Sequence, residues 1–158
     1  MSLETDVRLL QQLPLLSGFS EEKLRLLAFS AENRSFRDGQ RLFSAGDWAD
    51  SGYVVSSGKV AIHTEGSDTE QPVTIVERGA LVGELSLIVE GVRPATAVAV
   101  GPVEVIQIRR VLFRRMLEEF PDVAVSIQTR FFSRLEETNQ ALAKVAGRLK
   151  SIEEPGGG

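Results

Sequence analysis

Two charged residues of the sequence, Glu84 and Arg93, stand in a glycine-containing segment, residues 79–97, and have side chains suited to binding a small anion. An arginine guanidinium can donate two parallel hydrogen bonds to the oxygens of one phosphate. An ionised glutamate accepts the proton of a sugar hydroxyl. Gly83 lets a ligand approach the backbone, and the helix-forming run after it starts with free N–H groups. One cation facing one singly charged phosphate leaves no buried charge unpaired, so the segment suits a phosphate diester.

The same segment resembles the phosphate-binding cassette of cyclic-nucleotide-binding domains, which occur in protein kinase A regulatory subunits, cyclic-nucleotide-gated channels and bacterial catabolite activators. The family pattern is Gly-Glu-Leu-(Ala/Ser)-Leu, a short turn, and Arg-X-Ala. The sequence reproduces it as Gly83-Glu84-Leu85-Ser86-Leu87 and Arg93-Pro94-Ala95, and the resemblance extends over about residues 9 to 150. It implies that Glu84 holds the ribose 2′-hydroxyl and Arg93 the cyclic phosphate. Further hydrogen bonds are then expected from backbone groups of Leu85, Ser86 and Ala95.

Pro94 departs from the cassette pattern. In the family this position usually offers its N–H to the phosphate, and proline has none, so one donor is lost. A Thr or Ser here favours cyclic GMP in the family, and Pro94 has no hydroxyl. The expected ligand is therefore cyclic AMP, with cyclic GMP second. Two plainer interpretations stay open: Arg93 pairs with an acidic side chain on the surface of the domain, and Glu84 is an exposed turn carboxylate.

Short, often β-branched segments separated by glycines fill the middle of the chain. This texture predicts an antiparallel β-roll over residues 34–109, jelly-roll-like, with about eight short strands. Tyr53–Ser56 and Lys59–His63 are predicted as separate strands. Gly101–Pro102 is predicted as a turn between two more.

Helical spacing of apolar residues flanks this region on both sides. Ser20 is the expected N-cap of a helix, and Pro121 is expected to end the first helix after the strands. The fold class is therefore α+β, with one domain over residues 5–153. Its expected parts are N-terminal helices at 5–33, the roll at 34–109 with the cassette at 79–97, two C-terminal helices at 110–153, and a disordered tail at 154–158.

Two features of the C-terminal helices concern partners. Arg109, Arg110, Arg114 and Arg115 lie near two glutamates and are predicted to form a solvated face with local ion pairs rather than a DNA surface. Farther on, apolar residues recur at coiled-coil spacing, with Thr138 as the one polar member. This seam predicts a homodimer, the alternative being a helix that lies on its own domain. Its apolar members are Phe131, Leu135, Leu142, Val145 and Leu149.

The composition of the 158-residue chain argues against several classes of function. A net charge of −4 is opposite to what a phosphate-gripping nucleic-acid surface needs. The absence of cysteine removes thiolate metal sites and cysteine nucleophiles, and the single histidine, His63, is too few for a metal-binding barrel. No apolar run reaches the ~18 residues of a membrane span, and no signal peptide is recognisable, so a cytoplasmic location is expected.

Two functions remain to be weighed. The favoured one is a cyclic-nucleotide sensor module with no catalytic activity and no cofactor, lacking a helix-turn-helix or other output domain. The alternative is a nucleotide-free structural module, in which the cassette is degenerate and the seam holds two copies together. Pro94 motivates the alternative, since it removes a phosphate donor. The two differ in whether a cyclic nucleotide stabilises the protein.

Overall fold

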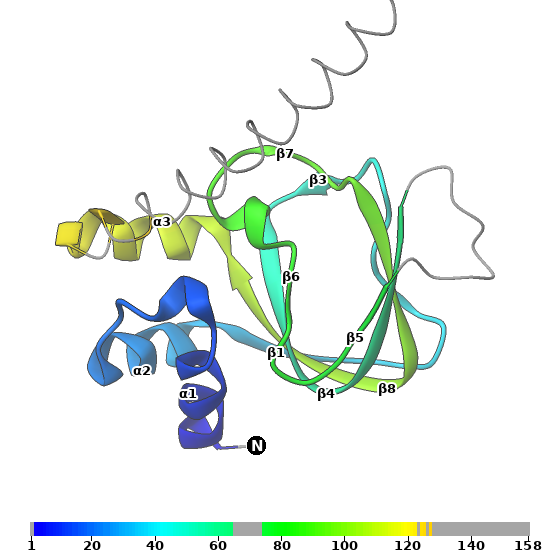
Figure 1. The fold of residues 1–158 in the computed structure, drawn as a ribbon, viewed down its shortest axis with the longest axis horizontal. Coiled ribbons are helices and arrows are strands. Elements are labelled where there is room, and N and C mark those ends of the chain that lie inside the picture. Colours follow the sequence, from blue (N-terminus) through cyan, green and yellow to red (C-terminus); the bar gives the residue numbers. More distant parts are fainter. Residues whose placement is uncertain (1, 65–73, 123, 126, 128–158) are drawn as a thin grey trace, which may run out of the picture.

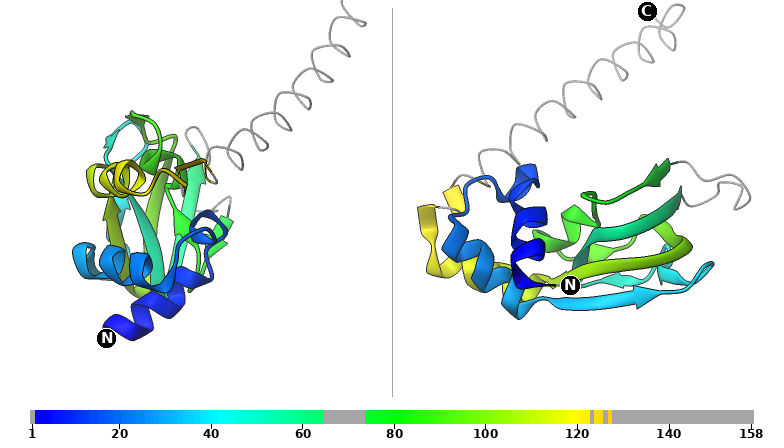
Figure 2. Two further views of the ribbon diagram at one scale, coloured as in Figure 1. Left: turned by 90° about the vertical axis from the view of Figure 1, so that its left-hand side faces the viewer. Right: turned by 90° about the horizontal axis from the view of Figure 1, so that it is seen from below.

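The computed structural model describes residues 2–64, 74–122, 124, 125 and 127. Its helices gather at one end of a roll of antiparallel strands (Figures 1 and 2). The first two helices precede the strands, and α3, which follows them, returns to pack beside α2. The predicted α+β architecture, a β-roll with helices on both sides of it in the sequence, is confirmed.

Every strand pair among the described residues is antiparallel. The main sheet has the order β1-β8-β4-β5, with β2 also paired to β8 and β6 to β4, while β3 and β7 form a separate two-stranded ribbon. The centre is the β4–β8 pair, which runs from Ser51 opposite Arg109 to Thr64 opposite Ala95. The strands are β1 (Glu32–Phe36), β2 (Arg41–Phe43), β3 (Trp48–Ala49), β4 (Ser51–Thr64), β5 (Thr74–Val76), β6 (Leu81–Val82), β7 (Gly91–Val92) and β8 (Ala95–Arg109).

The predicted turn at Gly101–Pro102 is wrong, because both residues lie inside the continuous strand β8. Likewise, the two short strands predicted around Gly58 are one strand, β4. The glycines mark a bulge: Ser57 lies opposite Glu104, whereas Lys59 lies opposite Val100, so β8 carries extra residues. Gly58 has φ +89°, and a Cβ there would collide with the carbonyl oxygen of Pro102. In a sequence, a glycine that permits a β-bulge cannot be distinguished from a glycine that permits a chain-reversing turn.

The helices begin and end where local chemistry predicts. Ser20 caps α2 (Glu21–Ser30), as expected, with its Oγ accepting a hydrogen bond from the N–H of Lys23 at 3.3 Å. Ser2 caps α1 (Leu3–Gln11) in the same way, and a short 3₁₀ turn, η1 (Pro14–Leu16), joins these helices. Helix α3 (Arg110–Glu119) ends before Pro121. The predicted seam, residues 131–149, and the predicted tail lie outside the described residues.

Two apolar clusters use opposite faces of the β4–β8 pair. Val54 and its cross-strand partner Ile106 pack against the helices, in a cluster that also contains the fully buried Phe113 of α3. Their neighbours Val55 and Val105, equally buried, face the interior of the roll. Successive side chains of a strand point to opposite faces, so one pair of strands serves both clusters. This arrangement ties the helices directly to the sheet that carries the cassette.

Candidate functional site

The cassette segment folds as β6, a short 3₁₀ helix and β7, before the chain enters β8. The 3₁₀ helix, η2 (Glu84–Leu87), begins after Gly83, which has φ +80° and therefore adopts the left-handed conformation that glycine tolerates best. Within η2 the N–H of Ser86 donates to the carbonyl of Gly83 at 3.1 Å. That backbone donor, predicted for a ligand, is thus used inside the turn.

The structure brings Gly83, Ser86 and Arg93 together. The Arg93 side chain is only 3% exposed, and its Nη1 donates to the Ser86 hydroxyl at 3.0 Å. A Cβ on residue 83 would lie 2.5 Å from this Nη1. Glycine is therefore needed at position 83 both for its backbone conformation and for the space that the guanidinium occupies. The two ends of the sequence motif are thus in direct contact.

The charge on Arg93 lacks a carboxylate partner among the described residues. Its Nε is buried without a hydrogen-bond acceptor in the described part of the chain. Burial lowers the pKa of Arg93, and the negative charges of Tyr53, Asp50 and Asp47, when ionised, oppose that effect. The open interpretation in which Arg93 pairs with a surface carboxylate is therefore not supported. A desolvated cation with unused donors is set up to receive an anion.

Two aromatic rings line the guanidinium of Arg93. Its Cζ lies 4.1 Å from the ring centroid of Phe43 on β2 and 5.6 Å from that of Tyr53 on β4. Sequence reasoning missed this contact. Alternation along each strand could suggest that these rings point inward, but their meeting depends on how β2, β4 and β8 pair, and no local pattern encodes that pairing.

The remaining predicted site residues surround this centre. Glu84 is half-buried at the first position of η2, and Leu85 beside it is exposed. Pro94 is exposed directly after Arg93. Ala95 is half-buried and opens β8 opposite Thr64. Glu84 and Leu85 thus belong to the η2 turn, whereas Pro94 and Ala95 lead from Arg93 into β8.

Arg110 corrects the prediction of a fully solvated arginine face. It is only 8% exposed, and its Nη1 lies within hydrogen-bond distance of the carbonyl oxygens of Ala49 (2.8 Å), Ser86 (3.4 Å) and Val89 (3.5 Å). The helix period alone could not reveal this, because the acceptors are backbone carbonyls that lie more than 20 residues earlier in the chain. The first residue of α3 thus holds the cassette.

The other arginines of that cluster are exposed to solvent, as predicted. Arg109 is half-exposed and pairs with Glu32 at 3.1 Å and with Asp50 at 3.5 Å. The hydrogen bond and the charge of Glu32 raise the pKa of Arg109. Arg114 and Arg115 are exposed on α3. Because exposed ion pairs contribute little, these residues are not expected to affect stability strongly.

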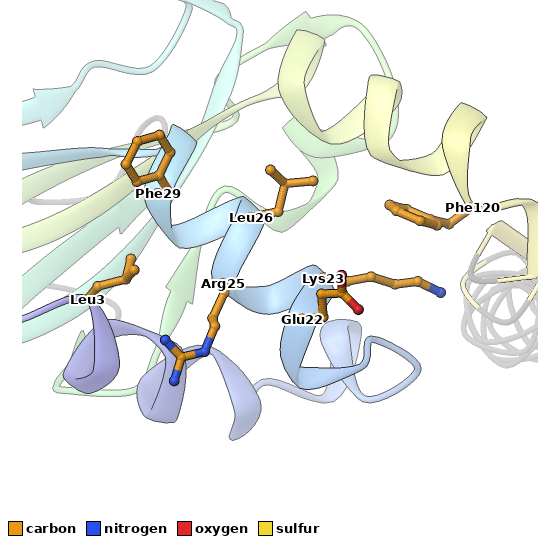
Figure 3. A pocket seen from close by; sticks show the side chains of 7 residues that line it. All are labelled: Leu3, Glu22, Lys23, Arg25, Leu26, Phe29 and Phe120. Atoms are coloured by element: carbon orange, nitrogen blue, oxygen red, sulfur yellow. The ribbon is translucent and has the colours of Figure 1, made fainter.

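A separate groove of about 450 Å³ lies between the helices (Figure 3). In it the Lys23 ammonium lies 4.4 Å from the ring centroid of Phe120 and pairs with Asp122 at 3.6 Å. The two basic residues of the groove, Lys23 and Arg25, thus have carboxylate partners, unlike Arg93. No cluster of three or more histidine, cysteine or acidic side chains that could hold a metal occurs among the described residues. The groove is lined by Leu3, Glu22, Lys23, Arg25, Leu26, Phe29 and Phe120.

A family model for the cyclic nucleotide-binding domain matches residues 33–120, which include the whole cassette and the aromatic pair. The chain belongs to this family. Among its relatives, the "Cyclic AMP receptor protein" of Thermus thermophilus is 32% identical over 130 residues, 82% of this chain and 60% of that protein. The "cGMP-dependent protein kinase, isozyme 1" of Drosophila melanogaster is 32% identical over 119 residues, 73% of this chain and 16% of that protein.

Solved structures of this family superpose on the fold. A cyclic nucleotide-binding-like protein from Brucella abortus is 41% identical, with a TM-score of 0.65, over 72% of this chain and 97% of that chain. The chain thus covers nearly all of this family member but spans less than two thirds of the two relatives above. No helix in the described part of the chain is both long and apolar enough to cross a bilayer.

Proposed function

We propose that this domain is a non-catalytic sensor that binds cyclic AMP, with cyclic GMP as the weaker ligand. The observation that carries the proposal is the buried Arg93 guanidinium, whose Nη1 donates to a neutral hydroxyl and which has no carboxylate partner among the described residues. Leaving a cation desolvated and underpaired costs stability, and a bound singly charged phosphate removes that cost. A protein keeps such a group where a ligand completes it.

In the proposed complex Arg93 binds the cyclic phosphate, and Glu84 accepts the proton of the ribose 2′-hydroxyl. Gly83 leaves room for the guanidinium and for the approaching ligand. Backbone groups of Leu85 and Ala95 add hydrogen bonds, while the N–H of Ser86 serves the turn. The N–H that the cassette usually offers after its arginine is missing at Pro94, and this lowers the phosphate affinity.

The preference for cyclic AMP rests on Pro94, which supplies no hydroxyl for a guanine base. The relatives include a receptor named for cyclic AMP and a kinase named for cyclic GMP, so family membership supports both ligands. Selectivity is therefore proposed to be modest. Losing one hydrogen bond changes affinity by about 0.5–1.5 kcal/mol, roughly twofold to thirteenfold.

The test is isothermal titration calorimetry with cyclic AMP on protein that has been unfolded and refolded to remove bound ligand. We expect micromolar or tighter binding, weaker binding of cyclic GMP, and loss of both in Arg93→Ala. Arg109→Ala is the matched control, because Arg109 is an arginine of the same domain whose carboxylate partners are in place. Absence of binding to the wild-type protein, at several temperatures, would refute the proposal.

A homodimer is proposed as the setting in which the sensor works, through the seam that residues 131–149 form in the sequence. Ile127, four residues before the seam, is buried in the same apolar cluster as Phe113 of α3. A movement of α3 would therefore displace the residue that leads into the seam. Sedimentation equilibrium at several concentrations tests the dimer, and a monomer at high concentration would refute it. The proposed location is the cytoplasm, where cyclic nucleotides act as signals.

A further inference from the structure

Arg93 is held from two directions. At its edge, Nη1 donates to the Ser86 hydroxyl at 3.0 Å. Over its face lie the rings of Phe43 and Tyr53, 4.1 Å and 5.6 Å from Cζ. A cation within about 6 Å of an aromatic centroid is attracted by the negative face of the ring, and the attraction grows when both groups are desolvated. Ring contacts consume no N–H donor of the guanidinium.

This way of stabilising a buried cation differs from a salt bridge. A carboxylate partner would occupy the same donors that a phosphate needs and would have to be displaced by the ligand. The rings stabilise the charge through its face and leave the edge available. Asp50 is close enough to act on Arg93 through its charge, yet its carboxylate accepts from Ser51 at 3.0 Å and pairs with Arg109 at 3.5 Å.

Building on the proposed function, we infer that Phe43 and Tyr53 form an aromatic shelf that positions Arg93 for the phosphate, and that Phe43 sets nucleotide affinity although it need not touch the ligand. Phe43 is therefore a positioning residue. Strands β2 and β4 each contribute one ring to the shelf. The two ring centroids are 5.8 Å apart, and the angle between the ring planes is 30°.

Tyr53 is the fixed half of the shelf. It is 4% exposed, and its hydroxyl lies 3.4 Å from Nε2 of Gln107, which also donates to Ser51 at 2.9 Å. Replacing Tyr53 would disturb this buried network. Phe43 is half-buried near the end of β2, so its ring can be changed with less effect on the core. The test therefore uses Phe43.

The experiment compares Phe43→Leu with Phe36→Leu by titration with cyclic AMP. Phe36 is a matched control, because it packs in the same apolar cluster and its ring also faces an arginine, Arg34, at 5.0 Å. Phe43→Leu is expected to weaken binding about fivefold to thirtyfold, the equivalent of one desolvated cation–π contact. Phe36→Leu is expected to change it less than about twofold. Phe43→Tyr, which keeps the ring, should restore wild-type affinity.

A second measurement separates positioning from general weakening of the fold. In NMR spectra of the free protein, the side-chain protons of Arg93 should be shifted upfield by the rings in wild type and Phe43→Tyr, and much less so in Phe43→Leu. Unshifted Arg93 protons in the wild type would overturn the inference even if Phe43→Leu did not fold.

Different results would refute the proposed function and the inference about Phe43. A wild-type protein that binds no cyclic nucleotide would overturn the proposed function and the inference that rests on it. A wild-type protein that binds cyclic AMP, with Phe43→Leu no weaker than Phe36→Leu, would overturn the inference alone.

Discussion

Replacing Gly83 by alanine tests the central contact of the site. The new Cβ would lie 2.5 Å from Nη1 of Arg93, where ordinary van der Waals contact begins at 3.4 Å. The guanidinium must therefore retreat by about 0.9 Å, the difference between these two distances. It is the flexible end of a long side chain, so it can retreat, but the retreat disturbs its 3.0 Å hydrogen bond to Ser86. The retreat also moves the donors that are proposed to hold the phosphate.

The Gly83→Ala variant is expected to lose both affinity and stability, for two different physical reasons. Charge-assisted hydrogen bonds have lengths of about 2.7–2.9 Å, so a shift of this size breaks at least one of them. Loss of one such bond costs about 1.5–3 kcal/mol, which corresponds to roughly tenfold to 150-fold weaker cyclic AMP binding. The left-handed backbone adds about 1–2 kcal/mol to the cost of folding. Titration calorimetry measures the first quantity and urea denaturation the second.

Gly39→Ala is the control that isolates the contact. Gly39 has the same φ, +80°, but a Cβ there would meet nothing within 4 Å. Both variants should therefore lose similar stability through the backbone, and only Gly83→Ala should lose affinity. Equal cyclic AMP affinity in the two variants would refute the view that Gly83 is needed for the position of Arg93.

Two further substitutions test how the cassette is held. Ser86→Ala removes the acceptor of Arg93 Nη1 and should lower the free energy of unfolding in urea by about 1–3 kcal/mol, with weaker cyclic AMP binding; a variant with unchanged stability would contradict the role given to this hydroxyl. Arg110→Met leaves the carbonyls of the cassette without their donor and should speed amide hydrogen exchange in residues 84–89 more than in β4. Uniform acceleration across both would show that Arg110 supports the whole fold instead.

Some features of the fold follow from short-range chemistry and were predictable. Ser20 caps a helix because its hydroxyl can reach the N–H three residues on, and Pro121 ends one because it lacks a donor. The bulge at Gly58 was not predictable, because the oxygen that excludes a side chain there belongs to Pro102, on another strand. The local sequence shows that a glycine is present, but only the pairing register shows whether it permits a bulge or a turn.

The candidate site divides in the same way. Gly83, Ser86 and Arg93 lie within one segment, and the family resemblance already implies that they belong to one site. Phe43 approaches Arg93 from a different strand, and its role depends on tertiary packing. In the sequence, Arg110 could not be distinguished from its exposed arginine neighbours, because the charge pattern does not show which backbone carbonyls it will bind. Prediction failed where a residue's partner is distant in the chain.

The β4–β8 pair also determines the order in which the site can be assembled. Its paired residues are far apart in the sequence, from 31 residues for Thr64 and Ala95 to 58 for Ser51 and Arg109. Such non-local pairing has a high entropic cost and slows folding. The cassette lies inside the loop that this pairing closes, so a chain emerging from the ribosome contains Arg93 before β8 exists to close the roll around it. The Phe43 and Tyr53 rings belong to strands that are held by β8, so the proposed binding site is complete only when the roll has formed.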